Sequence, residues 1–103
     1  MYKMYILVKE NIPLGFKAVA ISHASLCTYL KFKDDQETKE WLEKSFRKVI
    51  VEVSDEEFEK AKLFDGFVVI TESALDNKEI AIGFRPMKKI PTFFKMLRLF
   101  GSW

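Results

Sequence analysis

The pattern of apolar and polar positions in the first half of the chain predicts a strand followed by two helices. Residues 5–8 form a short β-rich apolar run closed by a polar turn, which is typical of a buried strand. Residues 16–30 are small and apolar on nearly every side, which predicts a central, buried helix. Asp34 and Glu37 have the spacing of a capping box, so a second, amphipathic helix is expected to follow. Its apolar positions at helical spacing are Trp41, Leu42 and Phe46.

The second half of the chain is richer in predicted strands. Three β-branched or aromatic runs are expected to form them: residues 49–53, 67–71 and 79–84. Ser54 and Glu57 form a second capping box and predict a third helix that ends near Phe64. The polar residues 72–78 are expected to be the loop between the last two strands.

The predicted order of elements is β-α-α-β-α-β-β-α. Pro91 suits the first turn of the last helix, which is expected to reach about Phe100. This order predicts an α/β fold, a small mixed four-stranded sheet with helices on both faces. A chain of 103 residues has room for one core, so residues 1–103 are expected to form a single domain.

The charges are segregated along the chain although the net charge is only +2. Both ends are basic and residues 34–79 are net acidic, so termini that lie side by side would build one basic face. Cys27 is the single cysteine and cannot form an intrachain disulfide. With no cleavable leader apparent at the amino terminus and no apolar run near the roughly 18 residues of a membrane span, we expect a cytoplasmic protein without a membrane partner.

Two short motifs resemble type 2 peptidyl-tRNA hydrolases. Residues 12–24 read Ile-Pro-Leu-Gly-Phe-Lys-Ala-Val-Ala-Ile-Ser-His-Ala, similar to the family's glycine-rich loop and first helix. Residues 80–83, Ile-Ala-Ile-Gly, look like its late strand, and Pro86 follows nearby. The element order agrees with the family's fold. The loop and the altered lysine position are more similar to uncharacterised bacterial proteins of this fold than to established hydrolases.

The resemblance implies three catalytic residues. Lys17 would contact the ester electrostatically, Glu72 would orient water and His23 would support them. Phe16 stands where the family has its catalytic lysine, and Lys17 follows one residue later, about 100° round the helix. Ala20 replaces the family's glutamine, and the loop after the third strand lacks its threonine. The implied reaction is hydrolysis of the ester that joins a peptide to the tRNA 3′ end.

Each of these residues also has a purely structural interpretation. Lys17 could face solvent, Glu72 could be a hydrated loop carboxylate, and His23 could simply satisfy a local hydrogen bond. Cys27 lies four residues after His23 on the same helical face, so a thiol activated by imidazole is a further hypothesis. The competing interpretation of this thiol is a small buried hydrophobe.

The last 17 residues are basic and aromatic. The positions with core-facing spacing are Ile90, Phe93, Phe94 and Leu97. The remaining apolar side chains are expected to form an exposed patch that favours a homodimer: Met96, Leu99, Phe100 and Trp103. Three basic residues suggest tRNA as a partner: Lys88, Lys89 and Arg98.

Other chemistries find little support in the composition. One His and one Cys cannot supply a classical zinc site, and the four glycines make no phosphate-binding loop. No metal and no cofactor are therefore expected. Three hypotheses follow: a peptidyl-tRNA hydrolase-like enzyme, a catalytically inactive homologue that acts as a ligand-binding or oligomeric module, and a nucleic-acid binder without chemistry.

Overall fold

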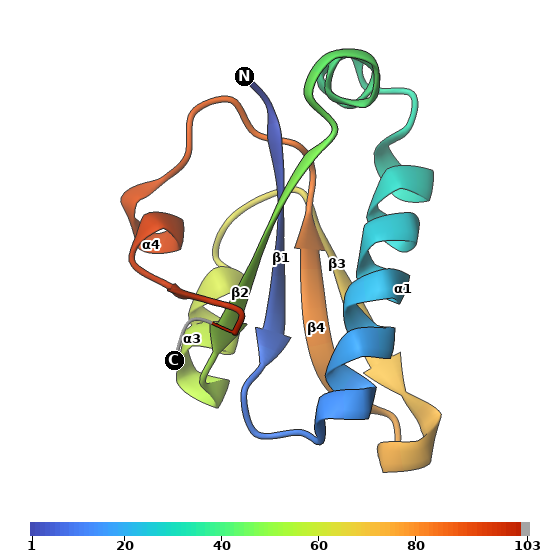
Figure 1. Ribbon diagram of the computed structural model, residues 1–103, viewed down its shortest axis with the longest axis vertical. Coiled ribbons are helices and arrows are strands. Elements are labelled where there is room, and N and C mark those ends of the chain that lie inside the picture. The colour runs from blue at the N-terminus through green and yellow to red at the C-terminus, as the bar shows by residue number, and fades with distance from the viewer. Residues whose placement is uncertain (102–103) are drawn as a thin grey trace.

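A computed structural model describes residues 1–101 and shows a mixed sheet between two layers of helices (Figure 1). The order of strands across the sheet is β3-β4-β1-β2-β5. Strands β1 and β2 are parallel, and the other neighbours are antiparallel. The strands are β1 (Lys3–Lys9), β2 (Arg47–Val53), β3 (Phe67–Glu72), β4 (Lys78–Phe84) and β5 (Arg98–Leu99). The predicted α/β class is confirmed.

The sheet has five strands, so the prediction of four was wrong. The last helix was expected to reach Phe100, but α4 (Thr92–Lys95) is a single turn and the chain then becomes extended. Leu99 pairs with Val51, and the Phe100 N–H donates to the carbonyl oxygen of Ile50 at 2.9 Å. Backbone groups along the outer edge of β2 need hydrogen-bond partners, and β5 supplies them.

Helices cover both faces of the sheet (Figure 1). One face carries α1 (Leu14–Phe32), and α2 (Gln36–Glu40) follows it and continues directly into the π-helical turn η1 (Trp41–Ser45). The other face carries α3 (Asp55–Ala61) and α4. A short 3₁₀ turn, η2 (Ser73–Leu75), joins β3 to β4.

Each face of the sheet has its own core because side chains alternate along a strand. On β1, Met4, Ile6 and Val8 pack under α1. Tyr5 and Leu7 point the other way, toward α3 and α4. A β1 that is buried on both faces explains why residues 5–8 read as a continuous apolar run.

Helix α1 is not buried on all sides, which corrects the expectation of a central helix. Only one stripe is buried: Ala20, Ala24, Thr28 and Phe32. Val19, Leu26 and Leu30 are exposed on its other sides. The helix is the outer layer over the sheet, so no further layer covers its other sides. The small residues Ala20 and Ala24 let it approach the strands closely.

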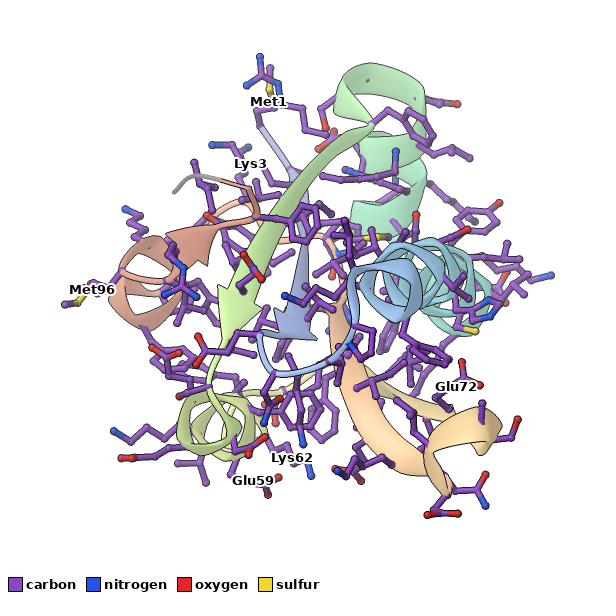
Figure 2. All side chains as sticks on the ribbon, turned by 60° about the horizontal axis from the view of Figure 1, so that its bottom comes forward. Met1, Lys3, Glu59, Lys62, Glu72 and Met96 are labelled. Atoms are coloured by element: carbon purple, nitrogen blue, oxygen red, sulfur yellow. The ribbon has the colours of Figure 1, made fainter. Side chains whose placement is uncertain are left out.

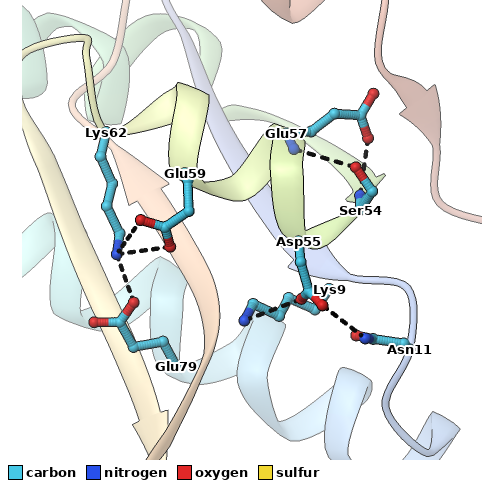
Figure 3. A network of polar contacts seen from close by, with 8 residues as sticks. All are labelled: Lys9, Asn11, Ser54, Asp55, Glu57, Glu59, Lys62 and Glu79. Atoms are coloured by element: carbon cyan, nitrogen blue, oxygen red, sulfur yellow. Dashed lines mark hydrogen bonds and ion pairs between the residues drawn. The ribbon is translucent and has the colours of Figure 1, made fainter.

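The two predicted capping boxes have different outcomes. The Ser54 Oγ accepts from the Glu57 N–H at 3.1 Å and Glu57 Oε1 accepts from the Ser54 N–H at 2.8 Å, which confirms the second box (Figure 3). The first box is wrong, because Asp35 rather than Asp34 caps α2 and makes no side-chain cap hydrogen bond. Its carboxylate is paired instead with Arg85, with Oδ2 3.0 Å from Nε.

Electrostatic contacts fix α3 against the sheet (Figure 3). Lys62 donates to Glu79 of β4 at 2.6 Å and to Glu59 at 3.1 Å, and these bonds raise the pKa of Lys62. At the other end of α3, Lys9 lies 3.2 Å from Asp55 and lowers the pKa of that carboxyl. These pairs connect α3 to β1 and β4, its neighbours in space.

The start of β1 lies beside the segment that follows β4. Lys3 and Met87 exchange two backbone hydrogen bonds of 2.9 Å. Phe94 and Leu97 are buried as their spacing predicted, whereas Met96 and Leu99 are exposed. Trp103, which was expected to belong to the exposed patch, lies outside the described residues. Within residues 1–101, no helix combines the length and the apolar character needed to cross a membrane.

Candidate functional site

A buried ion pair joins the first turn of α1 to β2. The Lys17 ammonium donates to Glu52 Oε2 at 2.8 Å, and the side chains are 12% and 1% exposed. The second oxygen, Glu52 Oε1, is buried and has no hydrogen-bond partner among residues 1–101. A charged carboxylate is costly to bury, so Glu52 depends on Lys17 for its compensation.

The alternation of β2 places Glu52 on this face. Val51 and Val53 belong to the core under α3 and α4, whereas Ile50 packs on the α1 side. Glu52 is two residues beyond Ile50 and therefore faces α1 as well. Lys17 reaches it from a loop and helix start that follow β1, the parallel neighbour of β2.

The arrangement can hold an ammonium group at a fixed place near the surface. One of the three Lys17 donors is occupied by Glu52, and the side chain retains some exposure. Such a group can stabilise negative charge that develops on a carbonyl oxygen. Glu52 contacts Lys17, and its own carboxylate is almost wholly enclosed.

Glu72 is not the partner of Lys17. It ends β3 beside the hairpin to β4 (Figure 2). Its Oε2 accepts from the N–H of Ala74 at 3.1 Å and so caps η2. The partly exposed Glu72 carboxylate lies at the same edge of the sheet as the start of α1, since β3 ends where β1 ends.

His23 lies on a different side of α1 from Lys17. His23 is six positions after Lys17, which places the two side chains roughly 120° apart around the helix. His23 and Cys27 are both exposed, and no hydrogen bond joins them in the described part of the chain. Phe16 is partly buried. The structure therefore brings Lys17 together with Glu52 and leaves His23 and Glu72 separate from this pair.

The basic C-terminal residues differ in their surroundings. Lys88 and Lys89 are exposed, and Lys88 Nζ lies 5.8 Å from the centre of the Tyr2 ring. Arg98 donates to Glu10 at 2.8 Å, and this bond raises the pKa of its guanidinium. No group of three or more His, Cys, Asp or Glu side chains suited to a metal ion occurs in residues 1–101.

Sequence reasoning missed Glu52. The run Val49 to Val53 indicates a β-branched strand, and this pattern gives its one carboxylate no role. The signal was present, because a charge inside a strand that is buried on both faces needs a partner. Which residue would be that partner could not be read from the spacing, since Lys17 is 35 positions away.

The chain matches a known protein family. The family model described as Peptidyl-tRNA hydrolase PTH2 matches residues 2–63. The match extends from β1 through α3, includes Lys17 and Glu52, and ends before Glu72. No curated protein matches the chain. Since the family model covers more than half of the 103 residues, the chain belongs to the peptidyl-tRNA hydrolase PTH2 family and is a peptidyl-tRNA hydrolase-like protein.

Proposed function

We propose that the protein hydrolyses the ester bond between a peptide and the 3′ end of tRNA. Membership of the PTH2 family supports this reaction. The observation that carries the proposal is the Lys17–Glu52 ion pair, which fixes an ammonium group at the start of α1. This is the segment that resembles the family's catalytic loop and helix.

In the proposed mechanism Lys17 is the catalytic residue and Glu52 is its positioning residue. The Lys17 ammonium contacts the ester carbonyl oxygen and stabilises the negative charge that forms when water attacks. Glu52 holds that ammonium by the 2.8 Å bond. Glu72 is proposed to orient the water, as its place at the end of β3 and the resemblance suggest. His23 has no role in this mechanism, because it is exposed on a different side of α1 from Lys17.

The test is release of peptide from a peptidyl-tRNA by the purified protein and its variants. Lys17→Ala is expected to lower kcat about 100-fold with little change in KM, because the contact strengthens in the transition state. Glu52→Gln keeps the shape of the side chain, and we expect a smaller fall in kcat. Lys33→Met, at the other end of the same helix, is the matched control and should retain full activity.

The Glu72→Ala variant distinguishes the role of Glu72 from that of Glu52. Loss of turnover in this variant supports the water-orienting role and excludes a contaminating hydrolase. Full turnover by Glu72→Ala together with loss of turnover by Lys17→Ala would exclude Glu72 from the mechanism. The proposed reaction would still stand. No turnover by the wild-type protein at high concentration would overturn the proposal in favour of a catalytically inactive binding module.

A further inference from the structure

A groove of about 390 Å³ lies between α1, η1 and the α1-facing side of β1 and β2. Its walls are largely apolar and include Ile21 of α1, Ile50 of β2 and the rings of Trp41 and Phe46. The volume falls within the range of roughly 300–1,000 Å³ that is usual for small-molecule sites. Neither His23 nor Glu72 lines the groove, so it is separate from these predicted catalytic residues.

The groove contains one charged side chain, that of Lys48. Its Nζ lies 3.1 Å from the carbonyl oxygen of Phe46 and 3.1 Å from the centre of the Phe46 ring. Within residues 1–101 no carboxylate lies at ion-pair distance from this ammonium. Burial lowers the pKa of Lys48, because desolvation disfavours its charged form. The ammonium thus faces an apolar groove without a counter-charge.

Three hydroxyl groups lie along the opposite wall, on α1. Ser22, Ser25 and Tyr29 line the groove and can each donate or accept a hydrogen bond. No acidic side chain lines it. An apolar body with one anionic end would match this arrangement, because its charge would compensate Lys48 and its body would remove apolar surface from water.

We propose that this groove binds a small aromatic carboxylate. The carboxylate pairs with Lys48, and the ring lies between Ile21 and Ile50 near the Trp41 and Phe46 side chains. Aromatic walls favour a planar ligand, since offset and edge-to-face ring contacts add to the burial of area. The proposal does not depend on hydrolysis of peptidyl-tRNA.

A second copy of the chain is the competing occupant. Leu26, Leu42 and Phe46 at the groove are 59%, 43% and 54% exposed, as surfaces that contact a partner often are. A copy seated on the groove would bury Lys48, and a carboxylate would then have to come from the partner. The small acid is favoured because the groove has the dimensions of a ligand site and supplies one cation.

The test uses two probes of the same shape, 2-naphthoate and the neutral 2-naphthalenemethanol, in titrations followed by amide chemical shifts. We expect naphthoate to bind at least about tenfold more tightly, which corresponds to about 1.4 kcal/mol, with the largest shifts in residues 21–29 and 41–50. Lys48→Met should abolish the preference for the acid. Lys60→Met, which changes an exposed lysine on the other face of the sheet, should retain it.

Three results of the titrations would overturn the proposal. They are equal affinity for the two probes in the wild-type protein, a preference for naphthoate that survives in Lys48→Met, and shifts that map to another surface. Ser25→Trp is a second variant that fills the groove while leaving Lys48 in place, and it should block both probes. Sedimentation that shows a dimer, with probe affinity falling as protein concentration rises, would assign the groove to a second copy instead.

Discussion

At the scale of single residues, the Lys17–Glu52 pair shows how a buried charge depends on one partner. Glu52 is 1% exposed, and its Oε2 accepts from Lys17 while its Oε1 has no partner within residues 1–101. Attraction within such a pair roughly offsets the cost of removing both charges from water. Removal of one partner leaves that cost uncompensated.

Lys17→Met is therefore expected to lower the free energy of unfolding by about 3 kcal/mol. The double variant Lys17→Met/Glu52→Leu should return to within about 1 kcal/mol of the wild type, because no unpaired charge remains. Urea unfolding followed by circular dichroism measures both values, and exposed Lys33→Met is the control. A double variant as unstable as Lys17→Met alone would contradict this account.

At the scale of elements, Gly83 sets the distance between α1 and β4. A Cβ at this position would overlap Thr28 Oγ1 and lie 3.1 Å from the carbonyl oxygen of Ala24. Thr28 is fully buried, and its hydroxyl has no hydrogen-bond partner among the described residues. The packing of this helix on the sheet is thus limited by two residues that are 55 positions apart, counting from Thr28 to Gly83.

Gly83→Ala should destabilise the protein by about 1–3 kcal/mol, because the core would be overpacked. Thr28→Ala removes the atom nearest to the added methyl group, so Gly83→Ala/Thr28→Ala should recover part of the loss. Thermal unfolding of the wild type, the two single variants and the double variant gives the free energy of interaction between positions 28 and 83. Additive effects on stability would show that the methyl group added at position 83 does not meet the Thr28 side chain.

At the scale of the whole molecule, the sheet brings Lys3 beside the basic segment that follows β4. Lys3 pairs with Met87 through two backbone hydrogen bonds, and Lys88 and Lys89 are exposed next to them. Arg98 is engaged by Glu10 at 2.8 Å. We propose that Lys88 and Lys89 contact tRNA, and we expect them to contribute more to the affinity than Arg98, because Arg98 is already paired with Glu10.

Binding of tRNA should weaken as salt rises, since phosphate contacts release counterions. Lys88→Gln/Lys89→Gln should reduce the slope of log affinity against log salt by about one for each lysine removed. Arg98→Gln should change this slope less, and Lys60→Gln on α3 is the control. Fluorescence anisotropy of labelled tRNA measures the slope, and an affinity that does not respond to salt would remove this surface as the binding site.

The local chemistry of the sequence predicted much of the fold. Residues 5–8 lie within β1, the Ser54 and Glu57 box begins α3, and residues 79–84 lie within β4. These features could be predicted because caps and apolar runs act over a few neighbouring residues. The family was also identified from its loop and first helix, which lie inside the matched residues 2–63.

Only the tertiary structure decided how these elements meet. The fifth strand forms because residues 98–99 find the open edge of β2, and local propensity alone favoured a helix there. Lys17 pairs with Glu52 because β1 and β2 are parallel neighbours, which places the start of α1 over the end of β2. Such contacts join residues that are far apart along the chain, so their identity depends on topology and on the cost of leaving a buried charge without a partner.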